Sequence, residues 1–235
     1  MIFKTSTSAK PYIVVLITIW YIFRMDTINS ETIDGYFSAL PRKAPADWKY
    51  LPDIGLYMDQ LVTYLERQLE LFTKAAGGSL ITPSMINNYA KSKIVPRAEG
   101  KKYGKEHVAL LLTVFTLKRV LSVQDMGSLV GKIGTASEVE EFYGRFRRGM
   151  EYSARETASL VGTALAEASD DDKHLDAKTL RDLALDLAVD ASIRSYAAET
   201  LLAFANPGEA ASDKEVKIKA KKEKAVSKKG KKASA

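Results

Sequence analysis

The sequence predicts a mainly α-helical protein, and three observations predict it. Apolar residues recur at helical spacing through most long segments, glycine makes up only 14 of 235 residues, and an apolar content of 46% suffices for a core. The expected organisation is an apolar extension at 1–24, a helix and linker at 25–53, a compact domain at 54–131, long helices at 132–206 and a disordered basic tail at 207–235.

The N-terminal extension contains twelve largely apolar residues, 12–23, between Lys10 and Arg24. A membrane-spanning helix needs about twenty such residues, and no small-residue cleavage site follows the run. The leading interpretation is a gene start assigned too early, with Met25 as the natural first residue. A weak membrane anchor is the second interpretation, and a packed strand or helix is the third.

Two helices are expected before residue 80. Ser30 is a good N-cap for a first helix that carries apolar residues at Ile33, Tyr36, Phe37 and Leu40. Trp48 follows in a proline-containing linker, where we expect it to cover the core. A second helix is predicted over 54–73, capped by Asp53 and ended by Gly77 and Gly78. Its apolar stripe comprises Tyr57, Leu61, Tyr64, Leu65, Leu69 and Phe72.

Residues 80–111 are the most informative segment. Thr82 as N-cap and Pro83 at the first helical position begin a helix that runs to about Lys91, with Ile86 and Tyr89 on its apolar face. Residues 93–96 then look extended, because a residue before proline is disfavoured in helix. A basic hairpin and a strongly apolar helix follow. This is the order of elements in a winged helix-turn-helix.

The stretches LPDIGLYMDQ, ITPSMINNYAKSKIVP and KKYGKEHVALLL carry a family resemblance. They resemble the DNA-binding module of MerR-type regulators, and more closely an uncharacterised bacterial domain-of-unknown-function family classed with the MerR-like helix-turn-helix proteins. The resemblance covers roughly residues 50–130. It implies a winged helix-turn-helix at 54–131 that contacts double-stranded DNA, and a homodimer formed through a C-terminal helix.

A recognition helix reads base edges with its N-terminal part while nearby cations bind phosphates. The candidate base-reading residues are Ser84, Met85, Asn87 and Asn88. The candidate phosphate-binding residues are Lys91, Lys93, Arg97, Lys101 and Lys102. Solvated amides and ordinary surface lysines are the alternative interpretation of the same residues. Tyr89 and Tyr103 are expected to be packing residues.

The remaining segments also show helical period. Residues 105–121 are apolar on nearly every side and predict a central buried helix, after which Ser122 caps a short helix to about Val130 and GKIGT forms a loop. Two long helices, Ser137 to about Ala168 and Asp176 to about Ala205, are joined by the polar DDDKHLD. A short connection favours an antiparallel helical hairpin, on the same chain or paired with a second subunit.

The formal net charge of +6 is concentrated in the tail. Residues 212–235 contain ten lysines and three acids, a charge of +7, which leaves −1 for residues 1–211. This tail has too few apolar residues to fold, and it fits either a non-specific polyanion contact or a solubilising end. The absence of cysteine excludes disulfides and thiolate metal sites and suits the cytoplasm.

The sequence offers no catalytic constellation, so we expect no enzyme and no cofactor. His107 has no evident nucleophile as a partner, and the acids of 170–176 lack the spacing of a calcium loop. Three functions remain open. The leading one is a dimeric DNA-binding transcriptional regulator. The alternatives are a protein-interaction module that keeps the helix-turn-helix fold, and a membrane-tethered form of either if residues 12–23 are an anchor.

Overall fold

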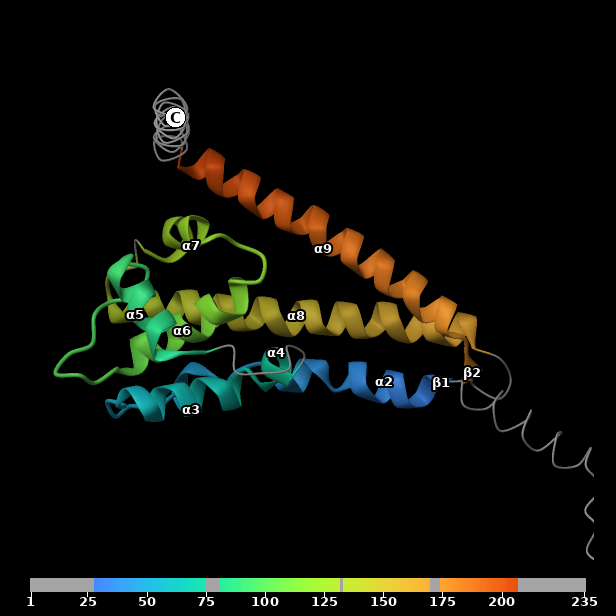
Figure 1. The fold of residues 1–235 in the computed structure, drawn as a ribbon, viewed down its shortest axis with the longest axis horizontal. Coiled ribbons are helices and arrows are strands. Elements are labelled where there is room, and N and C mark those ends of the chain that lie inside the picture. The colour runs from blue at the N-terminus through green and yellow to red at the C-terminus, as the bar shows by residue number, and fades with distance from the viewer. Residues whose placement is uncertain (1–27, 75–80, 132, 170–173, 207–235) are drawn as a thin grey trace, which may run out of the picture. The chain divides into compact units, whose positions relative to one another are not determined.

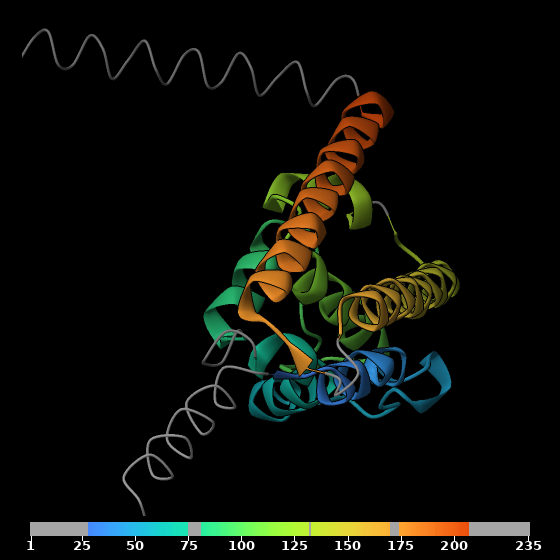
Figure 2. The same cartoon turned by 90° about the vertical axis from the view of Figure 1, so that its right-hand side faces the viewer.

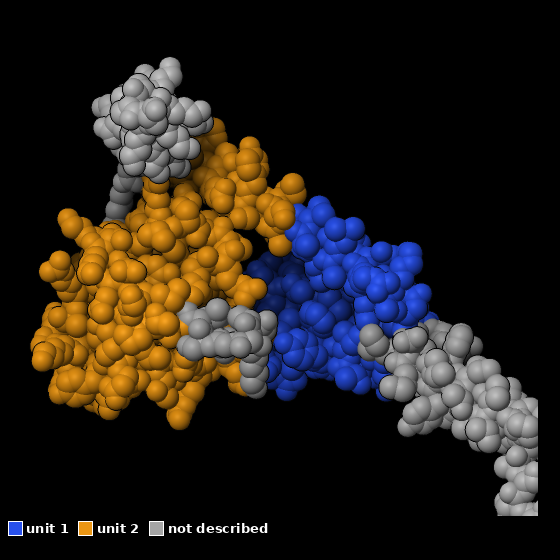
Figure 3. Space-filling model, in the orientation of Figure 1, with its two compact units in different colours: residues 1–44, 148–190 blue, residues 45–147, 191–235 orange. Residues whose placement is uncertain are grey.

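The computed structural model describes residues 28–74, 81–131, 133–169 and 174–206 (Figure 1). It is mainly helical, as predicted. The expected extension at 1–24 and tail at 207–235 lie outside the described residues. The chain divides into two compact units (Figure 3): unit 1 contains Met1–Ala44 and Arg148–Asp190, and unit 2 contains Pro45–Arg147 and Ala191–Ala235. Unit 2 therefore begins ahead of the expected domain start at residue 54.

Unit 1 combines an N-terminal helix with two short strands and parts of two long helices. Its elements are β1 (Ile28–Asn29), α2 (Ser30–Ser38), a 3-10 turn (Leu40–Lys43), the second part of α8 (Ala136–Ala168), β2 (His174–Leu175) and the first part of α9 (Ala177–Ala205). The two short strands pair antiparallel, with Ile28 opposite Leu175. The core consists of Val161, Leu165 and Leu175, against which Ile33, Phe37, Leu180, Leu183 and Leu187 pack. Apolar residues of α8, β2 and α9 thus share one core, and the helical hairpin as a whole stays a prediction.

Helix α2 differs from its prediction at both ends. Asn29 is the N-cap in place of Ser30, because its side-chain oxygen accepts a hydrogen bond from the Glu31 N–H at 2.8 Å. The helix ends at Ser38, and Leu40 belongs to the 3-10 turn that follows. Tyr36, expected on the apolar face, is exposed.

The elements of unit 2 pack around one buried helix. Its elements are a 3-10 turn (Trp48–Tyr50), α3 (Met58–Gln68), α4 (Glu70–Lys74), α5 (Pro83–Lys91), α6 (Lys105–Leu117), α7 (Val123–Val130), the start of α8 and the end of α9. Every residue of α6 from His107 to Phe115 is buried, which confirms the predicted central helix, although it ends at Leu117 and not at 121. Ser122 caps α7 as predicted.

The helix predicted over 54–73 is wrong at its start and is interrupted near its end. It begins at Met58, because the backbone of Leu56 exchanges two hydrogen bonds of 2.9 Å with the backbone of Tyr103. Asp53 is therefore not its N-cap, and Tyr57 is exposed. A break at Leu69 separates α3 from α4. The buried stripe of Leu61, Leu65 and Leu69 is as predicted.

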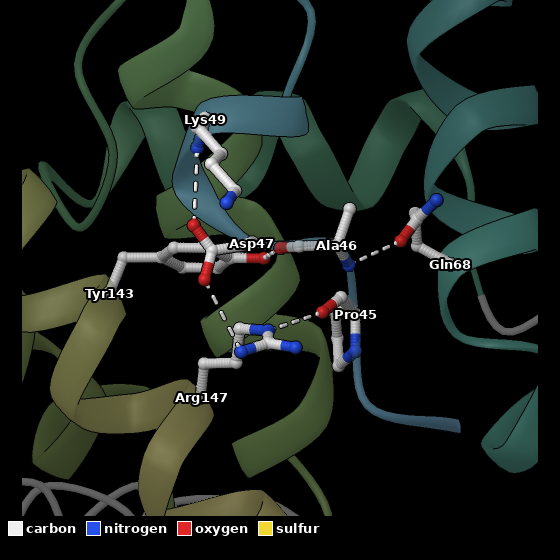
Figure 4. Close-up of polar contacts among 7 residues, drawn as sticks. All are labelled: Pro45, Ala46, Asp47, Lys49, Gln68, Tyr143 and Arg147. Atoms are coloured by element: carbon white, nitrogen blue, oxygen red, sulfur yellow. Dashed lines mark hydrogen bonds and ion pairs between the residues drawn. The ribbon is translucent and has the colours of Figure 1, made fainter. Parts of the chain in front are cut away.

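A segment before the first turn of unit 2 is held against α8 and α3 (Figure 4). The Tyr143 hydroxyl donates to the carbonyl of Ala46 at 2.7 Å, and Arg147 Nε donates to the carbonyl of Pro45 at 2.9 Å. The Ala46 N–H donates to the side chain of Gln68 at 2.7 Å. Trp48 then packs on the core beside Tyr143, as the sequence predicts. Burial raises the pKa of Tyr143, so its phenol remains a neutral donor.

Thr135 and Glu138 cap the N-terminus of α8 by hydrogen bonds in both directions. The N–H groups of Gly134 and Thr135 donate to the Glu138 carboxylate at 3.1 and 2.9 Å, while the Glu138 N–H donates to the Thr135 hydroxyl at 3.2 Å. This is a capping box, and it starts the helix at Ala136, one residue before the expected Ser137. Within the part of the chain that the structure describes, no helix is both long and apolar enough to cross a membrane.

Candidate nucleic-acid interface

Helix α5 is fixed with one face inward. The Thr82 hydroxyl accepts from the Met85 N–H at 3.2 Å and Pro83 occupies the first turn, so the helix begins where the sequence predicts. Ile86 and Tyr89 are buried, and the Tyr89 ring meets Phe115 of α6 edge to face with centroids 5.5 Å apart. Burial raises the pKa of Tyr89, which agrees with its predicted packing role. The opposite face therefore points to solvent.

The outward face of α5 carries most of the predicted base-reading residues. Ser84, Asn87 and Asn88 are exposed, whereas Met85 is half-buried and packs against the core. Three of the four side chains are thus free of apolar packing, and two of these are amides with both a donor and an acceptor. Helix α5 contains no acidic residue.

The turn after α5 corrects one expectation. Lys93 adopts a left-handed conformation with φ of 58°, whereas the sequence suggested extended backbone from residue 93. Helices commonly end on such a residue, which lets the following N–H groups return to the last turn. Here the Ile94 N–H donates to the carbonyl of Tyr89 at 3.0 Å. Ile94 and Val95 are buried, while Lys91 and Lys93 remain exposed.

Residues 97–103 form the predicted basic hairpin. Glu99 and Lys102 exchange backbone hydrogen bonds of 3.0 and 2.9 Å across Gly100 and Lys101, which have φ of 54° and 66°. Positive φ at both central residues is the geometry of a tight two-residue hairpin turn. Lys101 and Lys102 are exposed at its tip, and Lys102 Nζ lies 5.4 Å from the centre of the Tyr57 ring.

His107 fastens this hairpin to α6. Its Nδ1 accepts from the Gly104 N–H at 3.1 Å, and its Nε2 lies 3.2 Å from the carbonyl of Arg97. The neutral tautomer with hydrogen on Nε2 satisfies both contacts. The ring is 7% exposed and meets Tyr103 edge to face. The sequence indicated a structural histidine, but its two partners at opposite ends of the hairpin could not be read from spacing alone.

The predicted phosphate-binding residues fall into two groups. Lys91, Lys93 and Arg97 line one surface depression of about 290 Å³ beside the end of α7, and Lys101 and Lys102 lie at the hairpin tip. All five side chains are exposed. Residues 82–105 contain six cations and one acid, Glu99. This part of the surface therefore attracts anions, in contrast to the slightly negative total of residues 1–211.

The other predicted features contribute no site here. Among the residues that the structure describes, no group of three histidines or acids is placed to hold a metal ion. The aspartates at 170–172 and the apolar residues 12–23 lie outside the described ranges, so their alternative interpretations stay predictions.

Unit 2 thus presents a helical domain with an exposed polar helix and an adjoining basic hairpin. Residues 46–146 match the model of the family described as "Domain of unknown function (DUF1836)". This range covers α5, the hairpin and α6, and it coincides closely with the first segment of unit 2. No curated protein and no solved structure matches the chain significantly. The family description names no activity.

Proposed function

We propose that residues 46–146 form a MerR-like winged helix-turn-helix that binds double-stranded DNA, and that the protein regulates transcription. Helix α5 is the recognition helix and the hairpin at 97–103 is the wing. The observation that carries this proposal is the exposed, acid-free polar face of α5, which is followed directly by the exposed cations of the turn and hairpin.

The dimensions of α5 suit the major groove. A groove about 12 Å wide admits a single α-helix, and the N-terminal part of that helix reads the bases. Asn87 and Asn88 lie on the exposed face of the first two turns. An asparagine can bond adenine through N6 and N7 at once, with discrimination of about 1–3 kcal/mol for a good pair. Each amide is therefore expected to favour an A·T pair.

The cations around α5 supply the non-specific part of the affinity. Lys91 is the last residue of α5 and Lys93 and Arg97 follow it, while Lys101 and Lys102 extend from the hairpin. Each phosphate contact releases condensed counterions and steepens the dependence of log K on log salt by about 0.9. Five contacts would make binding strongly sensitive to salt.

A chain comprising residues 25–211 tests the proposal, because it lacks the lysine-rich tail that binds any polyanion. Affinity is measured against a library of genomic fragments and against random DNA over a series of salt concentrations. Tight, salt-dependent retention of a subset of fragments supports a regulator. Binding no better than that to random DNA contradicts it and favours the protein-interaction alternative.

A further inference from the structure

A surface depression lies where the end of α5 meets the end of α7. Figures 1 and 2 show the two helices next to each other, α5 in green and α7 in yellow-green. The depression has a volume of about 290 Å³. A cavity of about 150 Å³ holds a benzene ring, so this volume admits an aromatic ring with a charged group attached.

Three cations line this depression. Lys91 is the last residue of α5, and Lys93 and Arg97 follow it. Their side chains are exposed, and none of them forms an ion pair with another residue in the described parts of the chain. None of the described residues that line the depression is acidic. The positive charge is therefore not neutralised within the depression, and it favours an anionic ligand.

The rest of the lining is mostly apolar. Val130 at the end of α7 is 1% exposed, and Ile94 and Val95 after α5 are also buried. Ile133 is half-buried beside them. An apolar group placed against these side chains is favoured, because the contact removes apolar surface from water. The depression thus combines positive charge with an apolar wall.

Gly131 allows the two parts of the lining to lie close together. A Cβ at this position would lie 2.6 Å from the carbonyl oxygen of Gly127 and 3.4 Å from that of Lys93. The first distance is too short for a Cβ, so any other residue would displace the end of α7 from the turn after α5. Glycine therefore holds the apolar wall beside the cations before any ligand binds.

We infer that the depression binds a small organic anion with an apolar end, such as an aromatic carboxylate, and that this anion competes with DNA. Its charge would lie against Lys91, Lys93 and Arg97, and its ring against the apolar wall. A DNA phosphate would satisfy the cations but leave the apolar wall in water. The competition rests on the proposed function, which assigns the same cations to DNA phosphates, whereas the anion site does not.

Titration of the full chain without DNA tests the site. The probe is 2-naphthoate, followed through the backbone amide NMR signals of Lys93, Val95 and Gly131. Acetate provides the charge alone, and 2-naphthamide provides the ring alone. We expect 2-naphthoate to shift these signals to saturation with a dissociation constant of about 1 mM or lower, and each partial probe to bind at least about tenfold more weakly.

Two variants locate the charge contact. Arg97→Gln should raise the dissociation constant of 2-naphthoate about tenfold, because it removes a charged donor and keeps the backbone contact of Arg97 with His107. Arg145→Gln is the matched control, since Arg145 is exposed on α8 and does not line the depression. Equal affinities for acetate and 2-naphthoate, shifts confined to other residues, or equal effects of the two variants would overturn the site.

Competition is measured separately, on a DNA fragment that the chain retains and at constant ionic strength. At ten times its dissociation constant, 2-naphthoate should weaken DNA binding about tenfold, and acetate at the same concentration should not. Unchanged affinity for DNA would overturn the competition. Anion binding by a chain that retains no DNA fragment would support the site and contradict the proposed function.

Discussion

Asn87 and the pair Lys101 and Lys102 represent two kinds of contact with different consequences. The amide lies on the exposed face of α5, and the two lysines lie at the hairpin tip. An amide that bonds a base edge selects sequence, whereas an ammonium group beside a phosphate adds affinity for every sequence. Their variants should therefore separate specificity from affinity.

We predict that Asn87→Ala relaxes preference at one base step by about 1–3 kcal/mol and leaves binding to random DNA almost unchanged. The double variant Lys101→Ala with Lys102→Ala should weaken binding to all sequences and reduce the salt slope by about 2. Competition binding with single-base substitutions measures both effects. Equal effects of the two variants on every sequence would show that α5 is not the recognition helix.

His107 contributes to the stability of the fold and also holds the hairpin in position. His107→Ala removes the partners of the Gly104 N–H and the Arg97 carbonyl and should lower the free energy of unfolding by about 1–3 kcal/mol. It should also weaken DNA binding, because the hairpin loses its attachment to α6. Urea unfolding and DNA titration below the unfolding transition measure the two effects.

Tyr143→Phe is the control for His107→Ala, since it removes a partly buried hydrogen bond to Ala46 that lies outside the proposed interface. It should destabilise the fold by about 1–2 kcal/mol without changing affinity for DNA. If His107→Ala and Tyr143→Phe lower the affinity for DNA equally, then His107 affects DNA binding only through the stability of the whole fold and not through the position of the hairpin.

At the scale of elements, the stability that the N-terminal cap of α8 contributes should depend on pH. Hydrogen bonds from the N–H groups of Thr135 and Gly134 and from the Thr135 side chain lower the pKa of Glu138 from its usual 4.5. A depressed pKa stabilises the fold above the unfolded value and loses this effect as pH falls through the folded value. Glu138→Gln should therefore be less stable than the parent at pH 7, and the difference should shrink below pH 4.5.

Thermal unfolding at pH 7 and at pH 3 measures this dependence. Glu140→Gln, at an exposed position of the same helix, is the matched control and should change stability little at either pH. A Glu138→Gln deficit of the same size at both pH values would mean that the carboxylate charge does not contribute to the cap.

Elements with strong local signals were predictable from sequence. Thr82 with Pro83 and Ser122 each start a helix where they should, and the apolar run of α6 is buried. The sequence predictions are wrong where hydrogen bonds between residues far apart in the chain determine the local structure. The bridge between Leu56 and Tyr103 delays the start of α3, and no local pattern encodes it.

The candidate site likewise contains some features that local sequence predicts and others that depend on contacts between distant residues. The exposed residues of α5 followed from its period, because Ile86 and Tyr89 fix the inward face. The left-handed turn at Lys93 did not follow, since lysine has no preference for that conformation and tertiary packing of Ile94 imposes it. The contacts of Tyr143 with Ala46 and of Arg147 with Pro45 join residues about a hundred positions apart, beyond any local pattern.

At the scale of the whole molecule, charge is divided between the domain and the tail. Removing residues 212–235 deletes a charge of +7 and should lower affinity for random DNA more than affinity for a preferred site. Titrations of the full chain and of residues 1–211 with both DNA types measure the ratio of the affinity for the preferred site to the affinity for random DNA. A larger loss at the preferred site would assign sequence recognition to the tail.

In the proposed complex, the outward face of α5 lies against DNA bases. Because the chain has no native cysteine, a photoreactive group can be attached at one position only, in Asn88→Cys or, as a control, in Glu156→Cys on the exposed surface of α8. We expect cross-links to bases of a retained genomic fragment from position 88 and none from position 156. Cross-linking from position 156 with none from position 88 would contradict this placement of α5.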